Sequence, residues 1–206
     1  LPDFASELES RMLNRFLSLF RKQRPMRSWQ EFFFVTALEE LHLPSDTIEI
    51  DHFHGRCWSA ETDWVPVIFP EKVVSLTAAL PREKSTNYFF RGFVSSNRHW
   101  VQEYPGCESS DYGRQQKTRY RIDESYYRSM AQARFGLAPV GDCPWSYRFF
   151  EAVMCHALPV IGRDDHDLYA GDYHTLRDGA EHVYDASACE SNYQTLIRRH
   201  TLRHLR

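Results

Sequence analysis

Several absences limit what this chain can be. It contains no run of roughly 18–20 apolar residues, so no membrane-spanning helix is predicted. Neither charge is in strong excess, with 25 Lys and Arg against 28 Asp and Glu in 206 residues and a net charge of −3. General nucleic-acid-binding proteins usually carry a strong basic excess, so no nucleic-acid partner is expected. Apolar residues make up 42% of the chain, which is enough to form a sizeable core.

Cysteine is scarce, and its pattern is typical of neither a disulfide framework nor a zinc site. The five cysteines are widely spaced, their number is odd, and none form a C-x-x-C pair. This pattern favours reduced thiols in a cytosolic protein, with one or two bridges in a lumenal protein as the alternative. The first residues also lack the features of a signal peptide. We therefore expect a cytoplasmic location, or the Golgi lumen if the sequence is a piece of a longer eukaryotic protein.

An amphipathic helix is predicted at residues 3–23, where apolar residues recur at helical spacing and the end is basic. Two interpretations stay open. The helix either packs on its own domain with a solvated basic end, or docks on an anionic membrane surface and gives peripheral membrane association. A second helix is predicted at residues 29–41, opened by the capping-box pair Ser28 and Glu31.

Residues 46–80 change character, because short apolar runs are punctuated by prolines. Three strands are predicted here, in "TIEIDHFH", "DWVPVIF" and "KVVSL". The polar segment 80–87 follows as a predicted linker. It divides the chain into a short N-terminal α/β region, residues 1–84, and a second domain, residues 85–206.

After the linker, predicted strands and helices alternate. The strands are expected at 88–90, 135–139 and 158–162, and the helices at 98–104, 123–134, 146–157 and 190–205. This alternation is typical of βαβ units and a parallel sheet. Ligands bind such sheets outside the carboxyl ends of the strands, so the site is expected in the loops that follow them.

The stretch "PVGDCPWSYRFFEAVMCHALPVIG", residues 139–162, is the strongest candidate for that site. A loop leads from a strand into a helix capped by Ser146, so backbone N–H groups and the positive end of the helix dipole face the crevice. Arg148 and Glu151 share one face of this helix. They form either a surface ion pair or a binding pair. An arginine in the first turn, where the dipole disfavours a cation, favours binding of a phosphate.

The same stretch resembles the exostosin-like glycosyltransferases. The Arg148-x-x-Glu151 helix start and the strand at residues 158–161, "LPVI", match the family pattern in order and spacing, as does the upstream segment "DESYYRSMAQARF". The resemblance covers residues 88–184. It implies an α/β fold of GT-B type, in which a Rossmann-like parallel-sheet domain binds a nucleotide-sugar donor. It also implies an enzyme that transfers a hexose or pentose to a glycan or another hydroxyl acceptor, with residues 1–84 on the acceptor side.

The resemblance also assigns roles to residues. Glu151 would contact the ribose hydroxyls and Arg148 the diphosphate. The segment "YFFRGFVSSNRHW" also resembles the F-R-G element of a second family, the CAP10-like glycosyltransferases. Gly92 would allow a phosphate or sugar to approach, and Arg91 or Arg98 would stabilise the leaving diphosphate. The expected donor-binding residues are Arg91, Gly92, Arg98, Gly141, Trp145, Ser146, Arg148, Glu151, Asp164 and Asp165.

An inverting mechanism needs a base that deprotonates the acceptor hydroxyl. Asp51 and His54 of "EIDHFHG" are the candidates, against the alternative of an ordinary polar loop. Asp165-x-Asp167 could instead be the metal-binding D-x-D of the GT-A fold. We expect no metal or other cofactor, because arginines and a helix terminus can neutralise a diphosphate. The alternative function is a catalytically degenerate module that binds nucleotide or carbohydrate, or a partner subunit of a glycosyltransferase.

Overall fold

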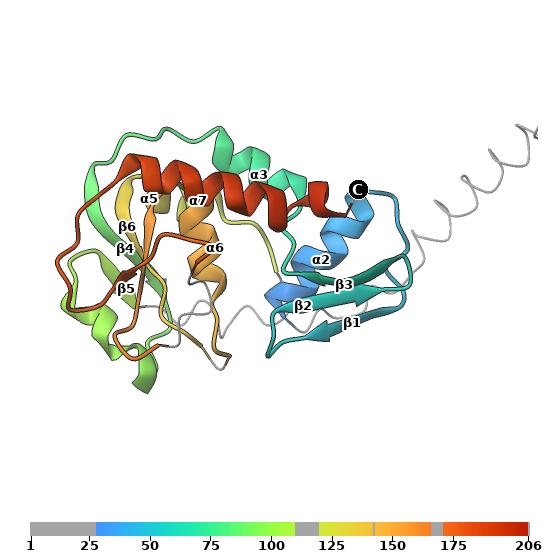
Figure 1. Ribbon diagram of the computed structural model, residues 1–206, viewed down its shortest axis with the longest axis horizontal. Coiled ribbons are helices and arrows are strands. Elements are labelled where there is room, and N and C mark those ends of the chain that lie inside the picture. Colours follow the sequence, from blue (N-terminus) through green and yellow to red (C-terminus); the bar gives the residue numbers. More distant parts are fainter. Residues whose placement is uncertain (1–27, 110–119, 142, 166–170, 206) are drawn as a thin grey trace, which may run out of the picture.

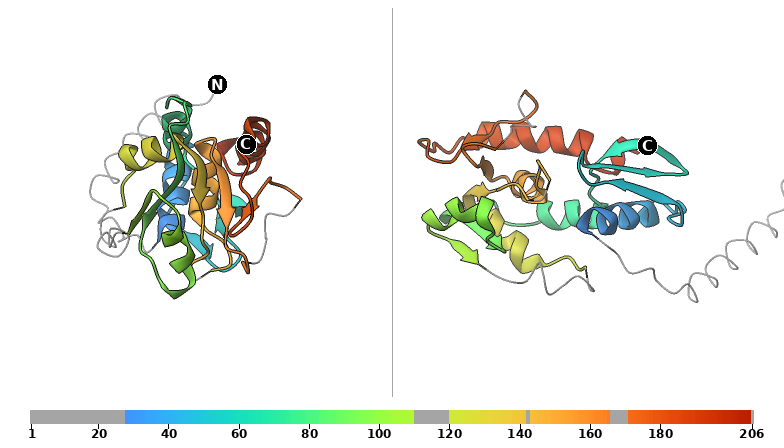
Figure 2. Two further views of the ribbon diagram at one scale, coloured as in Figure 1. Left: turned by 90° about the vertical axis from the view of Figure 1, so that its left-hand side faces the viewer. Right: turned by 90° about the horizontal axis from the view of Figure 1, so that it is seen from below.

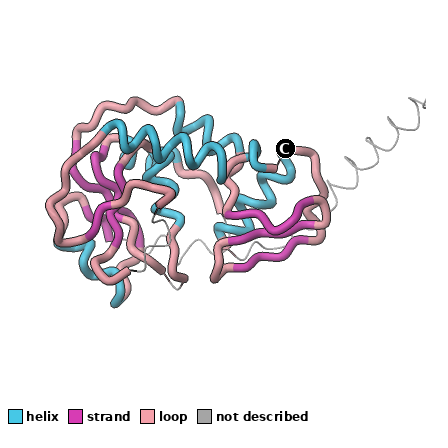
Figure 3. The backbone as a smooth tube through the Cα atoms, viewed as in Figure 1, coloured by secondary structure: helices cyan, strands magenta, loops and turns pink. Residues whose placement is uncertain are grey.

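The computed structural model describes residues 28–109, 120–141, 143–165 and 171–205 (Figure 1). Its strands form two sheets at opposite ends of the molecule, with helices between and alongside them (Figure 3). The predicted helix at residues 3–23 lies outside the described residues. Among those described, no helix is long and apolar enough to cross a membrane.

The first part of the fold is helix α2 (Trp29–Glu40) packed on an antiparallel sheet. The sheet consists of β1 (Ile48–Asp51), β2 (Arg56–Ser59) and β3 (Thr62–Pro66). The predicted cap is confirmed, since Ser28 Oγ accepts a hydrogen bond from Glu31 N at 3.1 Å. Strand β2 was not predicted, because its buried positions are Cys57 and the polar Ser59, while Trp58 is only partly buried. The sequence therefore shows no alternation of apolar and polar residues here.

The segment "KVVSL" was predicted as a strand, and that prediction is wrong. It lies in helix α3 (Glu71–Ala78), which follows Pro70 at its N-cap. The buried side chains are Val73, Val74 and Thr77, a helical spacing of one, three and four residues. Two adjacent valines fit either structure, and here the amphipathic helix buries both.

The second part is a five-stranded, all-parallel sheet, which confirms the predicted α/β class with a parallel sheet. Its strands are β4 (Thr86–Gly92), β5 (Cys107–Ser109), β6 (Ala133–Leu137), β7 (Leu158–Ile161) and β8 (Leu176–Arg177). They lie in the order β5-β4-β6-β7-β8. The chain therefore moves outward from β4 to β5 and then returns to β6 on the other side. This order is one of those common in doubly wound sheets, and it is consistent with a Rossmann-like domain.

Helices cover both faces of this sheet (Figure 2). They are α5 (Glu124–Ala131), α6 (Tyr147–Met154), α7 (Ala186–Arg199) and the 3-10 helix η1 (Ser96–Glu103), whereas a second 3-10 helix, η2 (Leu202–His204), packs on the first part. On one face Phe89 and Ile161 pack with α5 and α6. On the other, Phe90 and Val160 pack with Val101 of η1 and the first turn of α7. The predicted helix at 98–104 is thus a 3-10 helix, and the last α-helix begins earlier than predicted.

Helix α7 connects the two parts, because it runs from the parallel sheet to the antiparallel one (Figure 1). Beyond its end, Thr201 forms a parallel bridge with Phe69, and Leu202 is buried beside Phe34 of α2. Phe33 and Phe69 also share a core cluster with Phe149 of α6. The two parts therefore share buried contacts, and the boundary at residues 84–85 stays a prediction.

The prediction of a linker at residues 80–87 is wrong for its last two residues, which belong to β4, and Lys84 ties the rest to the second part. Lys84 Nζ donates hydrogen bonds to Ala131 O at 2.8 Å and to Cys155 O at 3.0 Å. These carbonyls belong to the C-terminal ends of α5 and α6, where a cation is favourable. All five cysteines, including Cys155, are free thiols.

Close packing of α6 on β6 requires Gly136. A Cβ at this position would lie 2.5 Å from Cβ of Ala152. We predict that Gly136→Ala lowers the free energy of unfolding by about 1–3 kcal/mol, because the added methyl overpacks the core. Urea denaturation measures this loss. The double variant Gly136→Ala/Ala152→Gly should lose less than the sum of the two single variants, and simple additivity would show that the contact is not the cause.

Candidate functional site

The carboxyl ends of β4 and β6 border the point where the strand order reverses. Two loops meet there: Asn97 Nδ2 donates to Gly141 O at 3.1 Å, and Arg98 Nε donates to Val140 O at 3.0 Å. Ligands of doubly wound sheets bind in the crevice at this place. The structure therefore brings residues 91–98 and the loop before α6 together, and we call this region the switch-point crevice.

Helix α6 begins at the crevice with the predicted cap. Ser146 is buried, and its Oγ accepts a hydrogen bond from Arg148 N at 3.2 Å. Phe149 and Val153 are fully buried against the sheet. Burial of this apolar face fixes the helix, so Arg148 and Glu151 are directed to defined neighbours.

The side chain of Arg148 extends across the carboxyl end of β4. Its guanidinium lies 4.9 Å from the ring centroid of Phe90, and Nε and Nη2 both donate to Arg91 O at 3.4 Å. A side chain at Gly92 would collide with this guanidinium. Glycine at position 92 is thus what allows Arg148 to reach the strand end.

Glu151 binds tyrosines and forms no ion pair with Arg148 within the described part of the chain. Tyr126 Oη donates to Oε2 at 2.8 Å and Tyr127 Oη donates to Oε1 at 3.0 Å. Burial raises the pKa of Glu151, and the two hydroxyl groups and the charge of Arg148 act in the opposite direction. The surface ion pair considered from the sequence is therefore absent. Sequence reasoning missed the tyrosines, although both stand in the motif segment "DESYYRSMAQARF".

Two other arginines lie around the end of β4. Arg91 Nε forms a 2.6 Å ion pair with Glu108 Oε2 on β5. Arg98 Nη1 donates to Phe93 O at 3.3 Å. Together with Arg148, they place three guanidinium groups along residues 91–93, although Arg91 is already paired with a carboxylate.

In the acidic loop after β7, Asp165 binds backbone amides of two loops. Asp165 Oδ2 accepts hydrogen bonds from Gly162 N at 2.9 Å and from Val140 N at 3.4 Å, which ties together the loops after β6 and β7. Asp164 is exposed, and Asp167 lies outside the described residues. In the described ranges, no group of three or more His, Cys, Asp or Glu could hold a metal ion.

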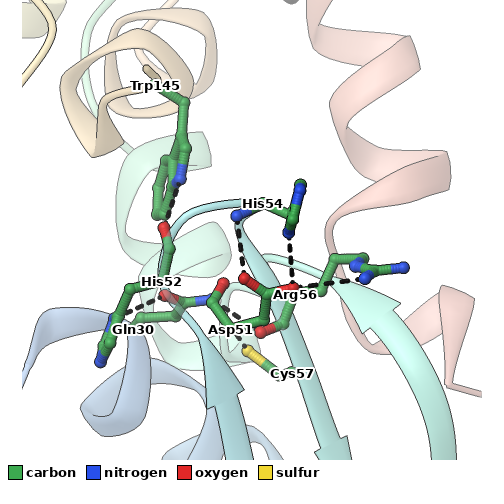
Figure 4. Close-up of polar contacts among 7 residues, drawn as sticks. All are labelled: Gln30, Asp51, His52, His54, Arg56, Cys57 and Trp145. Carbon is green, nitrogen blue, oxygen red and sulfur yellow. Dashed lines mark hydrogen bonds and ion pairs between the residues drawn. The ribbon is translucent and has the colours of Figure 1, made fainter. Parts of the chain in front are cut away.

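Asp51 and His54 lie in the hairpin that joins β1 to β2 (Figure 4). Asp51 Oδ2 contacts His54 Nδ1 at 2.8 Å and Arg56 Nη2 at 3.2 Å, and Oδ1 accepts from His54 N at 3.0 Å. These hydrogen bonds, first that of the His54 backbone N–H, lower the pKa of Asp51 to about 2. Asp51 is therefore a weak base. It instead orients the His54 ring, so that Nε2 is the nitrogen available to accept a proton.

Trp145 packs on the same hairpin. Its Nε1 donates to His52 O at 2.8 Å, and the indole lies directly over Gly55, whose φ is +63°. Gln30 supports the hairpin from α2, since its amide contacts His52 Nδ1 at 3.0 Å and donates to Arg56 O at 2.9 Å (Figure 4). Trp145, expected among the donor-binding residues, is thus placed against the N-terminal sheet.

A cleft of about 380 Å³ lies between this hairpin, α6 and α7. We call it the α6–α7 cleft. Its lining residues are His54, Gly55, Pro66, Val67, Trp145, Phe150, Asp172, Tyr173, Arg199, His200 and His204. Of these, the sequence had pointed only to His54 and Trp145. Gly55 and Phe150 stand in the segments quoted above but had no assigned role, and the others come from segments without a recognisable motif.

Similarity to known proteins is partial. No family model matches the chain. A probable glucuronosyltransferase of Oryza sativa subsp. japonica is 30% identical over 108 residues, which cover 48% of this chain and 25% of that protein. A probable β-1,4-xylosyltransferase of Arabidopsis thaliana is 49% identical over 41 residues, 20% of this chain and 10% of that protein. This chain is similar to part of plant glycosyltransferases.

The matched region spans a quarter or less of the length of these curated relatives. Their names are consistent with the resemblance to exostosin-like glycosyltransferases, and they support a transferase role in general. The roles of the individual site residues stay predictions.

His200, which lines the α6–α7 cleft, makes the free energy of unfolding depend on pH. His200 Nδ1 donates to Val67 O at 2.8 Å, and burial lowers the pKa of His200 to about 4. Between pH 6.5 and 4 the unfolded chain binds the proton and the folded chain does not, so stability is lost as the pH falls. We predict that His200 alone accounts for about 2 kcal/mol of the loss between pH 7 and pH 5.

The measurement is urea unfolding at both pH values. His200→Gln should reduce the pH dependence by this amount, whereas His99→Gln, which replaces an exposed histidine, should leave it unchanged. An equal pH dependence in His200→Gln and the wild type would contradict the assignment.

Proposed function

We propose that the switch-point crevice binds the diphosphate and ribose of a nucleotide sugar, and that the chain is the donor-binding part of a GT-B-type glycosyltransferase. The reaction would transfer a sugar to a glycan or other hydroxyl acceptor with inversion. The observation that carries the proposal is the arrangement of Arg148 at the start of α6, where its guanidinium and the helix terminus meet the end of β4.

The chemistry of transfer suits this arrangement. Negative charge builds on the diphosphate as the sugar leaves, and donors that are already oriented stabilise it by about 3–4 kcal/mol each. Arg148 is oriented in advance by Arg91 O and the Phe90 ring. Arg98, held by Val140 O and Phe93 O, would contribute from the other side of the crevice.

Glu151 would recognise the ribose. A carboxylate can accept about four hydrogen bonds, two at each oxygen. Each oxygen of Glu151 accepts one, from the hydroxyl group of Tyr126 or of Tyr127. A second position on each oxygen remains for the two hydroxyl groups of a ribose. Tyr126 and Tyr127 would act as positioning residues, because they hold the carboxylate in place.

His54 is the proposed base, and Asp51 the residue that orients it. A base for an inverting transfer must take the proton of the acceptor hydroxyl as its oxygen attacks. The contact of Asp51 with Nδ1 leaves Nε2 of His54 for this purpose, and His54 lies at the edge of the α6–α7 cleft. Peripheral membrane association through residues 3–23 remains a separate prediction.

Transfer is predicted to be independent of divalent metal. Arg148, Arg98 and the start of α6 would supply the positive charge that a metal would otherwise provide, and Oδ2 of Asp165 is already bound to two backbone amides. Activity measured with and without EDTA should be equal. Complete loss on chelation, restored by Mn²⁺, would overturn this prediction.

Replacement of Arg148 tests the donor site. Arg148→Ala should weaken binding of nucleoside diphosphates by about 1.5–3 kcal/mol, roughly ten- to hundredfold, because a charge-assisted contact is lost. Lysine at this position should restore only part of the affinity, since it cannot reproduce the guanidinium fork. The measurement is calorimetric titration with uridine and guanosine diphosphates.

Arg134→Ala is the matched control, because Arg134 is an exposed arginine of β6 that contacts Asn87 near the amino end of the sheet. The affinity of the Arg134→Ala variant for nucleoside diphosphates should equal that of the wild type. Unchanged affinity in a well-folded Arg148→Ala variant would refute the donor site. Binding without any transfer or hydrolysis of a nucleotide sugar would instead favour a degenerate binding module or partner subunit.

A further inference from the structure

The α6–α7 cleft has the surface chemistry of a sugar site. Pro66, Val67, Trp145, Phe150 and Tyr173 give it apolar walls, and its other side chains are polar. Its volume of about 380 Å³ lies in the usual range for small-molecule sites. A sugar ring has the same division, with an apolar C–H face and a polar edge of hydroxyl groups.

The charged groups of the cleft favour a neutral ligand. Arg199 Nη1 and Asp172 Oδ2 form an ion pair at 2.5 Å, and both side chains are about half exposed, at 50% and 44%. A phosphate would be repelled by Asp172 and a cation by Arg199. Neighbouring hydroxyl groups can satisfy both, because each hydroxyl group donates one hydrogen bond and accepts others.

His200 supplies a further uncharged acceptor. Its Nδ1–H is committed to Val67 O, which leaves Nε2 as the nitrogen with a lone pair. Its ring packs against Phe150 with centroids 4.5 Å apart, so the imidazole is held in one orientation. A fixed neutral acceptor suits a hydroxyl donor.

The cleft adjoins the switch-point crevice through the first turns of α6. Trp145 and Phe150 line the cleft, whereas Arg148 and Glu151 contact β4 and α5. We infer that the α6–α7 cleft binds the end of a neutral acceptor saccharide, with Arg199 and Asp172 contacting its hydroxyl groups and Trp145 forming an apolar wall. This inference rests on the proposed function, and it assigns Trp145 to the acceptor rather than the donor.

The test uses the whole chain and two probes, β-1,4-linked xylotetraose and cellotetraose, titrated while protein NMR shifts are recorded. The wild type should bind at least one of them, and Arg199→Ala should weaken that binding about tenfold, because a charge-assisted hydrogen bond is lost. The fold should survive, since an exposed ion pair contributes little to stability. Arg198→Ala, the neighbouring exposed arginine of α7, which contacts Thr195 outside the cleft, is the matched control and should bind like the wild type.

Nucleoside diphosphate titrations separate this inference from the proposed function. Arg199→Ala should keep wild-type affinity for the diphosphates. If the wild type binds a diphosphate but neither saccharide, or if Arg198→Ala and Arg199→Ala bind the saccharide equally, the inference is overturned and the donor site stands. The inference is also overturned if the wild type binds inorganic phosphate and Arg199→Ala does not. The α6–α7 cleft would then be an anion site. If no nucleoside diphosphate binds, the proposed function fails.

Discussion

The position of the first turns of α6 is the constraint on which both candidate sites depend. Burial of Phe149 and Val153 sets the helix on the sheet. Three contacts then hold the start of α6. Arg148 binds β4, Glu151 binds the tyrosines of α5, and Trp145 binds the β1–β2 hairpin. A shift of this helix would alter the switch-point crevice and the α6–α7 cleft together. Both sites are therefore parts of one packed unit.

Much of the fold was predictable because its long elements have regular signals. The segment 139–162 carries a cap, an amphipathic helix and an apolar strand, and the structure has all three in these places. The errors occur where elements are short. Strand β5 has three residues in a polar segment, and "KVVSL" fits a helix as well as a strand. In such cases tertiary contacts decide, and these are not visible in local periodicity.

The proximity of the candidate segments was predictable, and their contacts only partly so. The motifs were expected at the carboxyl ends of neighbouring strands, and residues 97 and 98 do contact the loop before α6. The partners of Glu151 and Trp145 were not predictable, since they depend on which helix or hairpin packs alongside. The α6–α7 cleft gave even less signal, because its walls range from His54 to His204 in sequence. Only folding brings these segments together.

Within the described residues, the chain crosses between the two sheets through α3 and the segment that leads to β4, and again at the end of α7. Near these crossings, Phe33 of α2, Phe69 and Phe149 of α6 lie in one buried cluster. Movement of one sheet relative to the other would expose these rings to water, so the hydrophobic effect opposes it. The α6–α7 cleft is lined by residues of both parts, and its width is therefore set by this cluster.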